Sequence, residues 1–351
     1  MNKNFSVYKI LSLIFMTFSL FSLEKQTSAS TPSTREPLPY DYDLFKKDTE
    51  VVFINADFLY WTAQAPGLEY AFKFDKLTDN ATVFGVGKYK MTSYEWKPGF
   101  RVTLGWFNAP KYWNVLAEYS CIKIEGFNTA EKSSDSIVAT FPQLATLSQE
   151  LATAKSRVVL NYNFVDLLAS RVFITNPHLR LRMMGGFTSG VIDQKWNIFY
   201  TDVLNQHERV FNKWKYTGIG FRVAVDFSWY WGNNIYLTAK ASNAILIGRY
   251  RYNSAISADT SGDFFDLCRF KEYRGAYNIQ FLLGPSYQKN FCKNRIEIFA
   301  GYELNGWINL HEINRNSAST QANQVITEKY QTNINGMLLM DGLSTRLTID
   351  F

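Results

Sequence analysis

Apolar and polar residues alternate one by one along most of the chain. In residues 52–60 the even-numbered positions are apolar, whereas Asn55 and Asp57 lie on the opposite face. Successive side chains of a β-strand point to opposite faces, so this pattern predicts a strand with one apolar and one polar face. The alternation recurs at 100–106, 113–120, 158–164, 179–188, 219–229, 237–242, 277–283, 295–303 and 343–351. In segment 158–164 the apolar positions Val158, Leu160, Tyr162 and Phe164 are expected on the outer face.

Strands of a soluble β-sandwich also alternate, but two features favour a membrane barrel. Short turns alternate with long polar loops, the former predicted at 108–111, 232–234 and 288–293 and the latter at about 64–94, 126–154, 253–270 and 308–335. The apolar faces are also long enough for a tilted strand to cross the hydrocarbon. Lipid offers no partner to backbone amides, so a sheet there must close on itself.

The predicted fold class is therefore all-β: an antiparallel transmembrane β-barrel with long extracellular loops and short periplasmic turns. About ten strands are expected, or twelve if 66–74 or 89–96 adds short ones. An even number places both termini on the periplasmic side.

The first thirty residues have the order of a secretory signal peptide. Lys3 and Lys9 precede an apolar stretch over 10–23, and small and polar residues follow up to Ser30. We therefore expect a signal peptide at 1–29, a periplasmic N-terminal segment at 30–49 and the barrel at 50–351. An uncleaved anchor is the alternative that the pattern leaves open.

The composition supports the membrane interpretation. Aromatic residues make up 17% of the 351 residues, more than a soluble core needs, and barrels use such rings as girdles at both lipid interfaces. The formal charge of +6 comes from scattered rather than clustered basic residues, which argues against nucleic acid as a partner.

The last strand carries a candidate insertion signal. The chain ends on Phe351, with Ile349 and Leu347 at the preceding alternate positions and Gly342 upstream. This arrangement resembles the C-terminal signal that the barrel-insertion machinery reads.

Several segments resemble one known family, the pore-forming, MOMP-like outer-membrane proteins of Legionella type, which also occur in chlamydia relatives. The resemblance rests on FINADFLYWTAQAPGLEYA (53–71), EWKPGFRVTLGW (95–106), WNVLAEYS (113–120), NYNFVDLLASRVFI (161–174) and KWKYTGIGFRV (213–223). It spans nearly all of the mature chain. It implies an outer-membrane barrel with porin-like activity, the passive diffusion of small hydrophilic solutes or ions. The loops share no motif with the family, so no ligand or adhesion role follows.

Charged residues on the inward face are the candidate lumen-lining set: Arg101, Glu118, Arg180, Arg182, Arg222, Asp226, Lys240, Arg295, Glu297 and Arg346, with Asp57, Glu303 and Asp350 beside them. In a water-filled lumen their basic excess would favour anions. In a narrow barrel the same charges would pair as salt bridges within a filled interior. Both interpretations remain open.

Helical spacing of Leu144, Leu147 and Leu151 predicts a short amphipathic helix over residues 143–155, inside the second long loop. Such a helix would either fold into the barrel mouth or cap the loop at the surface.

The chain has three cysteines, Cys121, Cys268 and Cys292, and export places them in an oxidising compartment. Because the number is odd, at least one must stay free or pair with another chain. They are candidates for a disulfide, for isolated thiols or for cross-links to neighbouring envelope proteins.

No enzyme is expected. The three histidines, His178, His207 and His311, lack an Asp-x-His or Asp-x-Asp partner nearby, and no cofactor-binding or metal-binding motif is present. Two functions remain: a porin-like pore, or a structural or adhesive barrel that acts through its loops around a narrow or filled lumen. The expected location is the bacterial outer membrane. The expected partners are outer-membrane lipids, the barrel-insertion machinery, small hydrophilic solutes and, as candidates, a homo-oligomer or disulfide-linked envelope neighbours.

Overall fold

The computed structural model of the chain describes residues 50–76, 86–108, 112–133, 136–141, 150–176, 178–258, 264–291, 294–319 and 328–351. The predicted signal peptide and the N-terminal segment up to residue 49 lie outside these residues. Within the described residues no helix is long and apolar enough to cross a membrane.

The described part of the chain forms one sheet of thirteen strands. They are β1 (Glu50–Gln64), β2 (Glu69–Lys76), β3 (Val86–Met91), β4 (Lys97–Asn108), β5 (Trp113–Glu131), β6 (Ile137–Ala139), β7 (Leu151–Asn176), β8 (Leu179–Asp202), β9 (His207–Gly232), β10 (Ile235–Ala258), β11 (Phe264–Phe291), β12 (Asn294–Ser319) and β13 (Glu328–Asp350).

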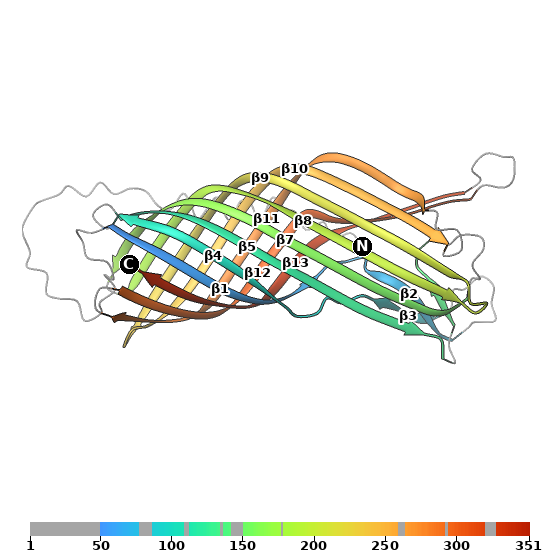
Figure 1. The fold of residues 1–351 in the computed structure, drawn as a ribbon, viewed down its shortest axis with the longest axis horizontal. Helices are drawn as coiled ribbons and strands as arrows, with labels where there is room; N and C mark the ends of the chain where they lie inside the picture. The colour runs from blue at the N-terminus through green and yellow to red at the C-terminus, as the bar shows by residue number, and fades with distance from the viewer. Residues whose placement is uncertain are drawn as a thin grey trace, which may run out of the picture. The chain divides into compact units, whose positions relative to one another are not determined.

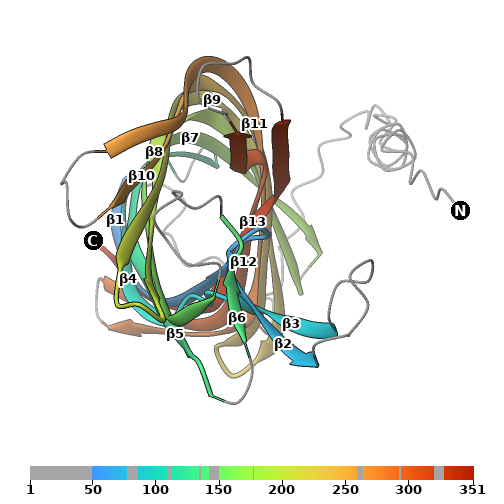
Figure 2. The same cartoon turned by 90° about the vertical axis from the view of Figure 1, so that its right-hand side faces the viewer.

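Ten of these strands close into an antiparallel barrel (Figures 1 and 2). Neighbouring strands pair in the order β1, β4, β5, β7, β8, β9, β10, β11, β12 and β13, and β13 pairs back with β1. At the seam, Tyr60 of β1 lies opposite Leu343 of β13 and opposite Pro98 of β4. The predicted fold class is thus confirmed. The short strands β2, β3 and β6 pair with each other and with β7 at Leu151, so they add none to the ring.

The two ends of the barrel differ. The connections β4–β5, β7–β8, β9–β10 and β11–β12 lie with the start of β1 and the end of β13, and we call this the turn end. The opposite end is the loop end. Between β9 and β10 the turn has two residues, Asn233 and Asn234, both with positive φ of 51° and 64°. Such a turn matches the twist of paired strands, and asparagine tolerates this backbone region well.

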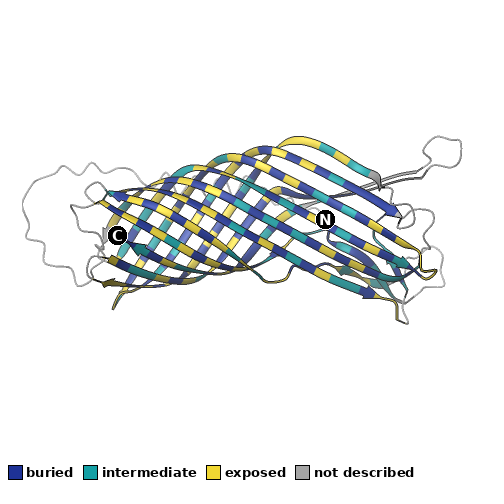
Figure 3. Ribbon diagram, viewed as in Figure 1, coloured by how far each residue is buried: buried dark blue, intermediate teal, exposed yellow. Residues whose placement is uncertain are grey.

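Exposed and buried positions alternate along the strands (Figure 3), and large apolar residues occupy many of the exposed positions, so the outer face is an apolar belt. Phe58, Leu104 and Phe281 are 52, 55 and 43% exposed, and each alternates with buried inward neighbours. Exposed rings border the belt, with Trp106, Trp113, Trp229 and Trp231 near the turn end and Tyr60, Trp96, Tyr119 and Tyr302 near the loop end. On β1 the belt runs from Val52, which lies opposite Trp106, to Tyr60. These eight residue steps span ~26 Å along the strand, or ~20 Å across a membrane at the usual strand tilt.

The strands are longer than the belt requires. Strands β7 to β13 have 23 to 28 residues, whereas a transmembrane strand needs about ten. Most of the predicted long loops at 253–270 and 308–335 are therefore wrong, because β10, β11, β12 and β13 continue through much of these ranges. The loop-end halves of these strands extend beyond the belt.

The face assigned to residues 158–164 is also wrong. Val158, Leu160 and Phe164 point inward and are at most 2% exposed, whereas Val165 and Leu167 form the outer face of β7. The helix predicted over 143–155 is wrong for residues 151–155, which begin β7, and residues 142–149 lie outside the described part. In both cases apolar residues pack inside the barrel at the loop end.

The belt predicts how a charge on the outer wall acts. Val102→Arg, opposite Ala56 at the midpoint of the belt on β1, places a cation near the middle of the hydrocarbon and should lower the free energy of unfolding by about 2–4 kcal/mol in lipid vesicles. Val203→Arg, at an exposed position between β8 and β9, should change it by less than about 0.5 kcal/mol. Urea titration of the folded protein in vesicles measures both values. Equal effects of the two changes would contradict the position of the belt.

Candidate functional site

The interior of the barrel contains two different regions. Towards the turn end, fourteen charged side chains point inward, and we call them the charged cluster: Asp57, Arg101, Glu118, Asp166, Arg180, Arg182, Arg222, Asp226, Lys240, Arg295, Glu297, Glu303, Arg346 and Asp350. Towards the loop end the interior is aromatic. All ten residues predicted to line the lumen belong to the charged cluster.

Arg101 on β4 is the centre of the cluster. Its guanidinium donates two hydrogen bonds to the carboxylate of Glu303, at 2.7 and 3.2 Å, in the bidentate geometry that suits arginine. Its Nη1 lies 3.4 Å from Asp57, and its Nε lies 3.5 Å from Glu118. Arg346 reaches Asp57 from the other side at 2.9 Å. One cation thus connects carboxylates from three other strands across the barrel.

A second group surrounds Arg222 on β9. Its Nε lies 3.2 Å from Asp166, and its Nη1 donates to Ser242 and Gln280 at 3.0 and 2.9 Å. Gln280 also donates to Glu303 and so links this group to Arg101, while Lys240 lies 4.0 Å from Glu118. Asp166 was missed in the sequence because β7 was assigned with its faces exchanged. Correct strand parity would have revealed it, since it is even-numbered like the inward-facing Phe164.

Asp166 alters the charge balance. With it, the cluster contains seven cations and seven anions, so the basic excess expected from the sequence disappears. Buried charges are stable only when they are paired and hydrogen-bonded, and the equal numbers meet that requirement.

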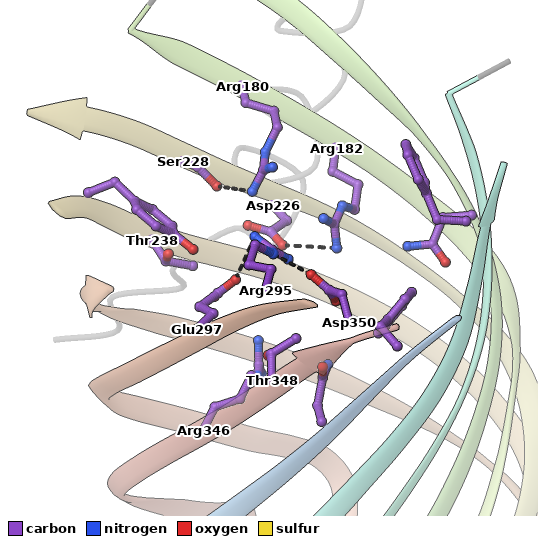
Figure 4. A pocket seen from close by; sticks show the side chains of 15 residues that line it. Arg180, Arg182, Asp226, Ser228, Thr238, Arg295, Glu297, Arg346, Thr348 and Asp350 are labelled. Atoms are coloured by element: carbon purple, nitrogen blue, oxygen red, sulfur yellow. Dashed lines mark hydrogen bonds and ion pairs between the residues drawn. The ribbon is translucent and has the colours of Figure 1, made fainter. Parts of the chain in front are cut away.

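A small cavity lies among the cluster residues nearest the turn end (Figure 4). Its volume is about 40 Å³, and Arg180, Arg182, Asp226, Arg295 and Glu297 line it. Arg182 lies 3.9 Å from Asp226, and Arg295 lies 3.3 Å from Glu297 and also pairs with Asp350. The cavity holds a few water molecules at most.

Beyond the charged cluster, aromatic rings fill the barrel. We call them the aromatic plug: Trp61, Tyr70, Tyr94, Phe141, Tyr162, Phe164, Trp196, Tyr200, Trp214, Tyr216, Tyr250, Tyr252 and Trp307. Phe164 packs on Trp307 with ring centroids 4.9 Å apart and stacks on Tyr162 at 4.6 Å. Trp61 joins the two regions, because its indole donates to Ser344 at 3.1 Å and lies under the guanidinium of Arg101.

Part of the plug comes from the connection between β1 and β4. Residues 66–71 and 92–95, which we call the inner segments, contact strands on several sides of the barrel. The hydroxyl of Tyr94 donates to Gln194 on β8 at 2.9 Å, and Tyr200 on β8 donates to the carbonyl of Tyr70 at 2.6 Å. The carbonyl of Pro66 lies 2.7 Å from Nε2 of His311 on β12.

The side chains at the centre of the first inner segment are almost without solvent contact, whereas Ser93 and Glu95 of the second are exposed. Leu68, Tyr70 and Ala71 are 1, 0 and 0% exposed. Burial raises the pKa of Tyr70 to about 12, so its side chain stays neutral at physiological pH. Within the described residues, the first loop narrows the barrel together with Ile137 and Phe141 of the second. In this conformation the loop half is closed.

Two of the three cysteines, Cys121 and Cys268, lie on different strands of the described part of the chain. Cys121 is a half-buried free thiol on the outer-face register of β5, and Cys268 packs against the aromatic plug from β11. Cys292 lies outside the described residues. A disulfide thus stays a prediction.

The histidines are also separated. His178 and His207 are exposed at opposite ends of the barrel, and His311 is buried in the plug. Within the described ranges, no group of three or more His, Cys, Asp and Glu side chains is placed to hold a metal ion.

The candidate insertion-signal residues lie on the last strand. Leu347 and Phe351 are 43 and 59% exposed on the outer face with the half-buried Ile349 between them, and the backbone N–H of Phe351 donates to Val52 at 2.9 Å. Gly342 faces inward at a close approach, since a Cβ there would lie 2.3 Å from the carbonyl oxygen of Tyr60.

Comparison with known proteins adds one extensive match. The family model described as Legionella pneumophila major outer membrane protein precursor matches residues 49–340. No curated protein matches the chain.

Solved structures resemble the chain only remotely. The Escherichia coli outer membrane protease OmpT is 8% identical, with 86% of this chain and 96% of that chain covered and a TM-score of 0.36. A Pseudomonas aeruginosa FadL homologue is 8% identical over 87 and 90% with a TM-score of 0.29, and the Pseudomonas putida toluene transporter TodX is 9% identical over 88 and 90% with a TM-score of 0.26. No functional argument rests on these likenesses.

The central position of Arg101 leads to a stability prediction. Arg101→Met leaves Glu303, Asp57 and Glu118 without their shared partner and should lower the free energy of unfolding by about 3–5 kcal/mol. Lys97→Met, which breaks the exposed pair with Glu95, should cost less than about 1 kcal/mol. Urea unfolding in vesicles measures both. The double variant Arg101→Met/Glu303→Gln should recover part of the lost free energy of unfolding. If it does not, the Arg101–Glu303 pair does not explain the destabilisation.

Proposed function

Because the chain belongs to the family of the Legionella pneumophila major outer membrane protein, we propose that it forms a narrow pore in the bacterial outer membrane, through which ions and small hydrophilic solutes diffuse passively. The chain is a bacterial outer-membrane protein with an all-β barrel. In the proposed orientation the turn end faces the periplasm and the loop end faces the exterior.

The observation that carries the pore proposal is the charged lining of the cavity at the turn end. Arg182, Asp226 and Glu297 are only half-buried there, and they present both signs of charge to a water-sized space. A barrel that merely holds its loops would be as stable with apolar residues packed at these positions. Charged groups beside water are what an ion path requires.

Passage needs a movable part, because the aromatic plug closes the loop half. The barrel wall cannot widen, since each of its ten strands is hydrogen-bonded to two neighbours. The inner segments are the candidate gate. Side-chain hydrogen bonds such as those of Tyr94 and Tyr200 join them to the wall, and breaking a few of these costs far less than opening a strand ladder.

A second function, a structural or adhesive barrel with a filled lumen, is favoured by one observation. Trp61, Trp307 and Leu310 are all 0% exposed inside the barrel, which is the packing of a protein core. In that case the charged cluster is a set of internal salt bridges and the exposed loop end carries the function.

We also propose that the chain is not an enzyme, since His178 and His207 lie at opposite ends of the barrel and His311 is buried in the aromatic plug, so the three do not share a site. The proposed partners are outer-membrane lipids, the insertion machinery, small solutes and, as candidates, further copies or neighbours linked through cysteines.

The pore proposal predicts the effect of removing the gate. Replacing residues 66–95 by a six-residue Gly/Ser linker should raise single-channel conductance in planar bilayers several-fold over the full-length protein, because the inner segments no longer cross the barrel. Tyr94→Ala, which loses the bond to Gln194 and a buried ring, should lengthen the open state of the full-length pore.

The matched control replaces residues 77–85, which lie between β2 and β3, and should leave conductance at the level of the full-length protein. Heat-shifted migration on a denaturing gel verifies that every variant is folded. A folded gate deletion that shows no conductance steps would contradict the pore and support the structural barrel.

The lining of the cavity predicts ion selectivity. Arg180→Gln together with Arg182→Gln removes two cations from the lining, so the reversal potential under a salt gradient should shift towards cation selectivity. Arg171→Gln removes an exposed outer-face cation near the turn end and should leave the reversal potential unchanged. An unchanged potential in the double variant would place the ion path elsewhere.

A further inference from the structure

Basic side chains gather on the outer wall of β8 to β11, directly beyond the apolar belt at the loop end. We call them the basic band: Lys195, Lys213, Lys215, Arg249, Arg251, Arg269 and Lys271. Six of them are exposed and Lys213 is half-buried. None of them contributes to the interior, so the pore proposal does not use them.

Cations of the basic band stand opposite one another on neighbouring strands. Lys215 of β9 pairs in register with Arg251 of β10, and Arg251 pairs with Lys271 of β11. Lys195 of β8 likewise pairs with Lys213 of β9. Side chains directly opposite on one face lie about 5 Å apart at Cβ, and like charges in such pairs are destabilising.

The protein supplies too little counter-charge for this arrangement. Across the described residues, the seven side chains make no ion pair. One carboxylate stands beside the basic band, that of Asp193, which lies opposite Lys215 and accepts a hydrogen bond from Asn161 at 3.1 Å. Across β8 to β11, the register row of Asp193 thus has three cations and one anion, and Arg251 still faces a cation on each side.

Three basic residues elsewhere on the outer wall differ in this respect. Lys97 pairs with Glu95 at 2.8 Å, and both Lys123 and Arg157 pair with Glu125. Lys123 lies in the same register row as Lys215, through Asn161 and Asp193. Cations that stand opposite one another on neighbouring barrel strands are thus found, among the described residues, on β8 to β11.

The surface next to the basic band is strongly apolar. Ile219, Ile245 and Ile247 are 62, 64 and 66% exposed, and Arg249 is the next outward position after Ile247 on β10. Tyr273, 84% exposed, lies opposite Arg249. Acyl chains against the isoleucines would therefore have their head groups at the level of the cations.

We propose that the basic band binds the phosphate groups of anionic lipids whose acyl chains lie against β9 and β10. Lysine and arginine are the natural donors to phosphate, and a phosphate between opposed cations turns their repulsion into attraction. The adjoining apolar surface selects a lipid over a free phosphate. The site is on the outer wall, so it stands whether or not the lumen conducts.

The test uses the refolded full-length protein in a neutral detergent and measures binding of phosphatidic acid and of phosphatidylcholine with the same acyl chains by native mass spectrometry. The unsubstituted protein should bind phosphatidic acid at least ~10-fold more tightly than phosphatidylcholine, since each cation near an anionic head group contributes about fivefold. Lys215→Gln/Arg251→Gln/Lys271→Gln should abolish that preference.

The matched control, Lys97→Gln/Lys123→Gln/Arg157→Gln, removes the same net charge from paired positions and should retain the preference. An equal loss in both triple variants would overturn the proposal in favour of net charge alone. Displacement of phosphatidic acid by millimolar inorganic phosphate would also overturn it, in favour of a free-anion site. Both triple variants are checked for the heat-shifted migration of a folded barrel.

Discussion

The backbone of this protein must satisfy its own hydrogen bonds where lipid surrounds it, and the rest of the structure follows from that constraint. The seam between β1 and β13 runs in continuous register from Phe53 opposite Asp350 to Gln64 opposite Leu339, and the terminal Phe351 still bonds to Val52. A sheet closed in this way has a fixed circumference. Its interior is therefore a confined volume, and every inward side chain must find its partners inside that volume.

The interior meets this requirement in two ways. Near the turn end, charges of both signs pair around Arg101 and Arg222, so that no net charge is buried. Near the loop end, rings and the inner segments fill the space as a protein core does. Trp61 touches both regions through Ser344 and Arg101. Water and ions are compatible only with the first region. Under the pore proposal, a path through the barrel therefore requires the inner segments to move while the wall stays unchanged.

The sequence was sufficient for the fold class, because lipid imposes a single rule on the outer face and that rule has a period of two. It was insufficient wherever a strand leaves the lipid. Beyond the belt the outside of the wall meets water and the inside meets the plug, so apolar residues change from the outward to the inward parity. On β7 the outward Leu167 and Val165 give way to the inward Leu160 and Val158. If the apolar positions are assumed to face outward along the whole strand, the two faces of β7 are exchanged. Asp166 is then not recognised as an inward-facing residue.

The change of parity also locates the membrane boundary on each strand. On β10 the outward Ile247 is followed by the outward Arg249, while the inward positions continue with Leu246 and Tyr250. Because the wall is a continuous ladder, this boundary passes from strand to strand in register, from β9 to β11. Isolated lysine and arginine residues are expected at a boundary between lipid and water, because their long side chains reach the head groups. Their placement in opposed pairs costs stability that the barrel itself does not recover. The phosphate of an anionic lipid supplies the missing counter-charge. The outer wall, as well as the lumen, therefore has a proposed binding role.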